Sequence, residues 1–300
     1  MASATSSVDP TAPENLEALC ATINAARRNA LGELQRQFSL VGTASPVTWV
    51  HSAVRPGLPS WPSDPAGIQV IGVNEHRSIV CSQGLCAPFS PTHPVVQRQS
   101  PEKRSTFWDS NGIRCEVFGV CDEPDPSVVR PGHWLCRIIS SGADYAAARM
   151  TAFWGMLSYE QSNQGSICVD MFVAPGLFAD EEQARRFVHR SPTGPADAMC
   201  ISVLFVANHG GAGCGMPERF TVPNCDMRCP HVWLYSAQLL HSDEAAYVYQ
   251  HKEAGRKELV EKLRAAGALG VSSLSRAPMV DGSSKTVSVN KMKPSAPARR

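Results

Sequence analysis

Two short runs of apolar residues place the strongest constraint on what this chain can fold into. The runs are ICVDMFVA at 167–174 and MCISVLFVA at 199–207, and both are rich in β-branched residues and nearly continuously apolar. Runs of this length and composition are typical of central strands that are buried on both faces. The sequence therefore predicts a sheet built around these two strands.

Other segments surround these strands with further regular structure. Additional strands are expected at 68–73, 78–81, 112–120 and 133–140, and 231–240 begins another strand or a helix. Helices are expected at 14–38, 144–158, 179–189 and from Ser242 or Asp243 to about Ala266. We therefore predict an α+β fold: a single mixed, β-sheet-rich body with an N-terminal helix, a long C-terminal helix and a Cys/His-rich loop.

Composition divides the chain into segments with different expected order. Apolar residues make up 43% of the chain, which is enough for a sizeable core. The ends are instead small, polar and proline-containing, as disordered segments are. We expect disorder at 1–12, the N-terminal helix at 13–42, a Pro-rich connector at 43–66, the globular α+β domain at 67–268 and a disordered basic tail at 269–300.

The formal net charge of +1 hides a concentration of positive charge in the last segment. From Arg276 onward the sequence has six basic residues and a single acidic residue, Asp281. A basic tail of this kind either binds RNA, DNA or an acidic protein surface by counterion release, or only keeps a terminus soluble. Under the first reading, the nucleic-acid-binding residues are Lys285, Lys291, Lys293, Arg299 and Arg300.

The chain holds eleven cysteines, an odd number in a large sequence. The first residues lack the basic and apolar regions of a secretory signal, so we expect reduced thiols in an intracellular, cytoplasmic or nuclear protein. No apolar run reaches the roughly 18 residues of a membrane span. Reduced cysteines in such a protein bind metal or pack in the core.

The loop HGGAGCGMPERFTVPNCDMRCPH at 209–231 contains the densest set of metal donors. Zinc prefers thiolates and imidazoles at tetrahedral corners, and four protein ligands make a closed structural site. We therefore predict a zinc site made of Cys214, Cys225, Cys229 and His231, with His209 in reserve. The alternative is that these are ordinary reduced cysteines in a loop.

Other cysteines suggest weaker sites. The CSQGLC segment can bring Cys81 and Cys86 together as half of a second metal site, with His76 or His93 nearby. The alternation in CEVFGVC, from Cys115 to Cys121, instead favours a strand. The remaining cysteines in apolar settings are interpreted as core residues: Cys20, Cys136, Cys168 and Cys200.

The same loop also permits a catalytic hypothesis. A cysteine in a glycine-rich turn can act as a nucleophile beside backbone amides that stabilise an oxyanion. A chymotrypsin-like thiol protease with Cys214 as nucleophile would need an upstream base and acid, and a later histidine in the specificity pocket. The available residues are His51 or His76, Asp109 or Glu116, and His231, but Ala212 stands where the usual motif has glycine.

Taken together, these features favour a non-enzymatic intracellular binding or assembly protein that zinc stabilises. Its basic tail would contact nucleic acid or an acidic partner. Low charge, many prolines, a small-residue N-terminal segment and a basic terminal arm are traits that fit a viral structural or accessory protein. Two alternatives stay open: the Cys214 hydrolase, and a homo-oligomeric scaffold without metal or nucleic acid in which the N-terminal helix drives self-association.

Overall fold

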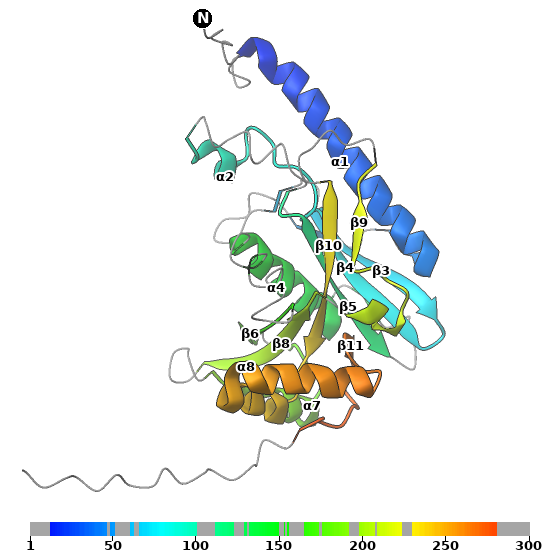
Figure 1. Cartoon of the computed structure of the whole chain (residues 1–300), viewed down its shortest axis with the longest axis vertical. Coiled ribbons are helices and arrows are strands. Elements are labelled where there is room, and N and C mark those ends of the chain that lie inside the picture. Colours follow the sequence, from blue (N-terminus) through cyan, green and yellow to red (C-terminus); the bar gives the residue numbers. More distant parts are fainter. Residues whose placement is uncertain are drawn as a thin grey trace, which may run out of the picture.

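The computed structural model describes most of the body of the chain. It covers residues 13–46, 49–51, 61–62, 66–100, 112–122, 129–130, 132–149, 153, 155, 165–173, 176–191, 198–207, 209–223 and 230–280. Over these ranges eleven strands form one mixed sheet with helices packed around it (Figure 1). The predicted α+β fold, with an N-terminal and a C-terminal helix, is confirmed.

The main path of the sheet has the order β1-β3-β4-β5-β10-β8-β6. Its strands are β1 (Thr43–Ala44), β2 (Trp49–His51), β3 (Ala66–Asn74), β4 (Arg77–Gln83), β5 (Cys115–Asp122), β6 (Ser166–Phe172), β7 (Val188–Arg190), β8 (Met199–Val206), β9 (Arg219–Thr221), β10 (His231–Leu239) and β11 (Val271–Ser272). The short strands β2, β7, β9 and β11 pair with β3, β8, β10 and β5. β10 joins the two halves, because it runs parallel to β5 and antiparallel to β8.

The two apolar runs of the sequence form β6 and β8, which pair antiparallel along their whole length. β8 has the predicted central position and is buried from Cys200 to Val206. β6 instead ends the main path of the described sheet. Its alternate side chains Cys168 and Asp170 are only partly buried, and Phe172 is 73% exposed. The prediction of a strand buried on both faces therefore holds for β8 and is wrong for β6.

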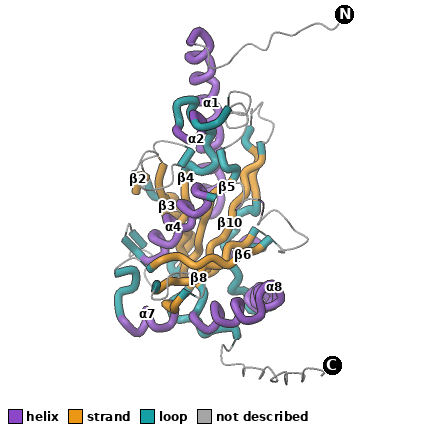
Figure 2. Tube along the Cα trace, turned by 90° about the vertical axis from the view of Figure 1, so that its left-hand side faces the viewer, coloured by secondary structure: helices purple, strands orange, loops and turns teal. Residues whose placement is uncertain are grey.

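Helices cover both faces of the sheet, as Figures 1 and 2 show. They are α1 (Pro13–Val41), α2 (Pro94–Gln97), α4 (Trp134–Ala148), α7 (Glu181–Phe187) and α8 (Ser242–Ala265), with a 3-10 turn, η2, at Gly210–Gly213. α4 packs its apolar face on one side of the sheet. On the other side α1 covers Ile71, Ile79 and Phe118, and α8 covers Leu204 and Val206. No helix in the described ranges has the length and apolar character needed to cross a membrane.

The strand predicted at 133–140 is wrong, because these residues begin the helix α4. The ring of His133 caps it by accepting a hydrogen bond from the Leu135 backbone N–H at 3.4 Å. The run was ambiguous because Trp134 and Cys136, outside the helical stripe, are also apolar and buried. The stripe itself recurs at helical spacing through Leu135, Ile138, Ile139, Gly142, Ala143 and Ala146. The helix predicted at 144–158 starts earlier, and most of its later residues lie outside the described ranges.

The C-terminal helix α8 folds back on itself at Lys252, whose backbone has φ 52° and ψ −129°. The Tyr247 hydroxyl donates a hydrogen bond to the Glu258 carboxylate. A Cβ added to Gly255 would lie 3.2 Å from the Tyr247 carbonyl oxygen. In a straight helix Tyr247 would be more than about 10 Å from both Gly255 and Glu258 along the axis. Residues 242–251 and 253–265 therefore form two arms side by side, at a backbone cost on the order of 1–3 kcal/mol for Lys252.

The described body continues to residue 280, within the segment 269–300 for which the sequence predicts disorder. β11 pairs with β5 through Val271 and Ser272. Further along, both guanidinium Nη atoms of Arg276 donate to the Glu244 carboxylate, at 2.6 and 2.7 Å. The two side chains of this ion pair are 9% and 0% exposed. Arg276 therefore belongs to the body, and residues 281–300 lie outside the described ranges.

Gly119 allows α4 to lie close to the sheet. A Cβ at this position would come within 2.8 Å of Leu135 Cδ1 and 2.9 Å of Ile139 Cδ1. Real Cβ atoms do not approach other carbons so closely, so a side chain here would push α4 away from β5 or force both residues out of their rotamers.

We expect Gly119→Ala to lower the free energy of unfolding by about 1–3 kcal/mol, because a packed interior cannot absorb the added methyl group. Gly72→Ala is the matched control in β3, where the nearest atom to an added Cβ is 3.9 Å away. It should change stability by less than about 0.5 kcal/mol. Urea denaturation of both variants tests this, and equal effects would contradict the packing argument.

Candidate metal centre

Three adjacent strand segments bring one metal donor each to the same face of the sheet. In the register of β6 and β8, Asp170 lies opposite Ser202, and in that of β7 and β8, His189 lies opposite Cys200. Alternate residues of a strand share a face, so Cys200 and Ser202 lie on the same side of β8 as Leu204. Leu204 packs against α8, and this places the donors between the sheet and that helix.

The donor atoms of Asp170, His189 and Cys200 are already close together. His189 Nε2 is 3.8 Å from Asp170 Oδ1 and 3.9 Å from Cys200 Sγ. One ligand atom from each residue lies within 4.8 Å of the other two. Tetrahedral zinc with bonds of about 2.0–2.3 Å needs donors roughly 3.3–3.8 Å apart. The cluster can therefore hold a metal ion after small side-chain movements.

The electrostatics of the cluster favour a bound cation. The Asp170 and His189 side chains are 13% and 15% exposed, and Cys200 is 1% exposed. Burial raises the pKa of the Cys200 thiol to about 11, and the negative charge of Asp170 adds to this effect. A divalent ion beside both groups would reverse that repulsion and ionise the thiol.

Hydroxyl groups hold the carboxylate of Asp170 in place. Ser202 Oγ donates to Asp170 Oδ1 at 2.7 Å, and Ser191 Oγ donates to Asp170 Oδ2 at 3.1 Å. His189 Nε2 lies 2.9 Å from Ser202 Oγ. In a hydrolytic triad the histidine lies between the acid and the serine. Here the serine lies between the other two and gives its proton to the acid, so the arrangement suits ligand positioning rather than nucleophile activation.

The structure describes only part of the zinc site that the sequence predicts in the 209–231 loop. Cys214 is buried, in contact with the cluster that includes α1 and β10. His231 is exposed at the start of β10, with its Nδ1 3.0 Å from Thr221 Oγ1. Cys225 and Cys229 lie outside the described residues. The four-ligand site therefore stays a prediction.

The reserve ligand, His209, is buried in the same region. Its ring lies edge-on to Phe118, with centroids 4.9 Å apart. Burial lowers the pKa of His209 to about 4, so the ring is neutral near pH 7.

The residues proposed for a thiol hydrolase do not form an activated centre over the described residues. Burial raises the pKa of the Cys214 thiol, whereas a nucleophilic cysteine needs a lowered pKa. Of the two candidate bases, His76 is exposed in the β3–β4 turn, and the His51 side chain lies outside the described part. Of the candidate acids, Asp109 also lies outside it, and Glu116 is fully buried in β5.

The CSQGLC segment surrounds a carboxylate in the structure. Glu116 Oε1 accepts hydrogen bonds from the backbone N–H groups of Gly84 and Cys86, both at 2.9 Å. Its other oxygen accepts from Ser82 Oγ at 2.5 Å. His93, a candidate ligand for this segment, instead has its Nε2 3.0 Å from the Trp61 carbonyl oxygen. The loop therefore satisfies a buried acid, and burial raises the pKa of Glu116 to about 7.

This raised pKa predicts a pH dependence of stability. The folded state favours protonated Glu116, so its contribution is greatest below the ordinary pKa of 4.5 and is lost as the pH rises to about 7. The full difference corresponds to roughly 3 kcal/mol. We expect Glu116→Gln to remove this pH dependence. In denaturant titrations, the free energy of unfolding of the variant should therefore rise relative to that of the wild type as the pH increases from 4.5 to about 7. Parallel pH profiles would contradict the assignment.

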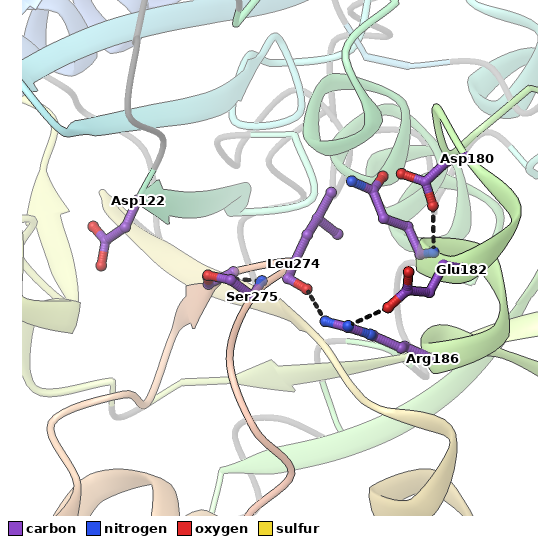
Figure 3. Close-up of a pocket in the computed structure, with 8 residues that line it drawn as sticks. Asp122, Asp180, Glu182, Arg186, Leu274 and Ser275 are labelled. Carbon is purple, nitrogen blue, oxygen red and sulfur yellow. Dashed lines mark hydrogen bonds and ion pairs between the residues drawn. The ribbon is translucent and has the colours of Figure 1, made fainter.

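A pocket of about 350 Å³ lies between α7, the end of β5 and residues 273–275 (Figure 3). Arg186 donates a hydrogen bond to Glu182 of the same helix, α7, at 2.7 Å, and another to the Leu274 carbonyl oxygen at 3.5 Å. Asp180 accepts from the Gln183 backbone N–H, and Asp122 pairs with Arg77. Each charged group in this wall therefore already has a partner in the body, and we assign no ligand to the pocket.

None of the three residues of the candidate metal centre was predicted from the sequence. Cys200 was interpreted as a core residue and His189 as part of a helix, and Asp170 was absorbed into an apolar strand. The donors come from three strands, so no short ligand spacing marks them. One signal was available: a single carboxylate within ICVDMF needs a partner if that strand is buried.

Comparison of the chain with protein-family models, curated proteins and solved structures finds no match. The candidate metal centre is therefore assigned from its geometry and donor chemistry.

Proposed function

We propose that the protein is a non-enzymatic binding or assembly protein whose body is stabilised by a metal ion at Asp170, His189 and Cys200. The observation that supports this most directly is the convergence of an oxygen, a nitrogen and a sulfur donor within 4.8 Å. Thiolate and imidazole donors suit zinc, whereas magnesium and calcium prefer oxygen ligands. Zinc is therefore the metal we propose.

A structural role fits the surroundings of the cluster better than a catalytic one. A catalytic zinc keeps one coordination position open to water and substrate. Here the ligands have little exposure, and the Ser202 hydroxyl lies against two of them. An ion at this point would connect β6, β7 and β8, including the three-residue strand β7. Metal binding would then contribute directly to folding stability.

Self-association through α1 receives less support. The apolar face of this helix is used within the same chain, where Ala30, Leu34 and Phe38 pack on β3, β4 and β5. We therefore place the binding function in the basic residues of the C-terminal tail. Because Arg276 pairs with Glu244, the basic residues of the tail that we propose as contacts for a nucleic acid or an acidic protein surface are Lys285, Lys291, Lys293, Arg299 and Arg300.

Elemental analysis of the purified, reduced protein tests the metal assignment. We expect about one zinc per chain in the wild type and most of it lost in Cys200→Ala, because three donors define the site. Cys136→Ala, which removes a buried thiol from α4, and Cys225→Ser should both keep the metal. Loss of zinc in Cys225→Ser but not in Cys200→Ala would contradict this assignment and place the ion in the 209–231 loop.

Removal of residues 281–300 tests the role of the tail and leaves Arg276 on Glu244. Because five cations are lost, binding to a short random-sequence DNA duplex should weaken, and its logarithmic salt slope should flatten by up to about 4. Changing the five basic residues to glutamine should reproduce the deletion. Fluorescence anisotropy at several salt concentrations measures this, and an unchanged affinity and slope would exclude the tail as the nucleic-acid contact.

A further inference from the structure

Tyr249 approaches the metal centre from the first arm of α8. Its ring lies 6.2 Å from that of His189, centroid to centroid, at an interplanar angle of 59°. The Tyr249 side chain forms a hydrogen bond with Asp170. The phenol also interacts with Ser202. The phenol therefore lies beside Asp170, a candidate ligand, and beside Ser202.

The arrangement of the donors indicates where a fourth ligand must come from. Asp170, His189 and Cys200 all extend from one face of the sheet and form the base of the site. In a tetrahedral site with three ligands in the base, the fourth position points away from that base. This direction leads toward α8, which covers the same face. Ser202, by contrast, extends from β8 within the base and is fully buried there.

We propose that Tyr249 is the fourth ligand and that the ion thereby fastens the first arm of α8 to the sheet. This inference rests on the proposed metal centre. As the ion binds, the Cys200 thiol and the Tyr249 phenol each release one proton to solvent, and their sulfur and oxygen atoms form bonds to the metal. Three anionic ligands then surround a divalent ion and leave one formal negative charge in excess. The cation Arg256 of α8 acts on Cys168, two residues from Asp170 in β6.

A metal bond to Tyr249 would add to the contacts that already hold the first arm of α8. The buried side chains of this arm are Glu244, Ala245 and Val248, and the strained turn at Lys252 follows shortly after Tyr249. Glu244 fixes the start of the arm through Arg276. A bond from the metal to Tyr249 would fix the other end, next to the turn.

Cobalt(II) titration of the full-length, metal-free, reduced protein tests the fourth ligand. The wild type should bind one cobalt ion with the ultraviolet difference band of an ionised phenol. Tyr249→Phe should keep the stoichiometry, lose that band and bind at least about tenfold more weakly. Tyr247→Phe is the matched control from the same arm, since that phenol bonds to Glu258 instead. It should behave as the wild type.

Hydrogen exchange supplies a readout on the unmodified chain. Removing the metal with a chelator should accelerate amide exchange in residues 242–251 and leave α4 unchanged. Cobalt binding without a phenolate band, and with equal affinity in Tyr249→Phe, would overturn the fourth-ligand assignment while the metal centre stands. Failure of the wild type to bind cobalt or zinc would overturn the metal centre itself.

Discussion

The two-residue alternation of β8 is the constraint on which both the core and the candidate site depend. Ile201, Val203 and Phe205 face the cluster that includes α4, whereas Cys200, Ser202 and Leu204 face α8. A shift of one residue against β6 would exchange these sets. It would place a thiol and a hydroxyl in the apolar core and separate Cys200 from Asp170 and His189. The packing of α4 therefore also fixes the register that assembles the metal donors.

Three carboxylates with little exposure, those of Glu244, Glu116 and Asp170, are stabilised in different ways. Glu244 is neutralised by Arg276, and Glu116 is held by three hydrogen bonds with its pKa raised to about 7. Asp170 is bonded by the hydroxyls of Ser191 and Ser202, and it lies beside the Cys200 thiol and the Tyr249 phenol, whose pKa values are both raised by burial. The first two sites are complete as they stand. The third has the composition of a site that a cation completes.

The sequence was informative wherever a local pattern sets the structure. The helix predicted at 14–38, the strands predicted at 68–73 and 78–81, and the apolar runs of β6 and β8 all correspond to elements that the structure contains. The pattern failed at α4, where a buried run masked the helical stripe, and at Lys252, where nothing local marks a reversal. It also failed for Asp170, His189 and Cys200, because their proximity arises from the pairing of β6, β7 and β8. Sites built across strands depend on tertiary register, which local periodicity does not encode.

The position of a bound metal tests this account most directly. Anomalous diffraction at the zinc absorption edge, from crystals of the zinc-loaded protein, locates the ion without assumptions about its ligands. The account predicts a peak about 2.0–2.3 Å from Asp170, His189 and Cys200, on the side of the sheet that α8 covers. A peak surrounded instead by Cys214, Cys225, Cys229 and His231, or no peak at all, would contradict it.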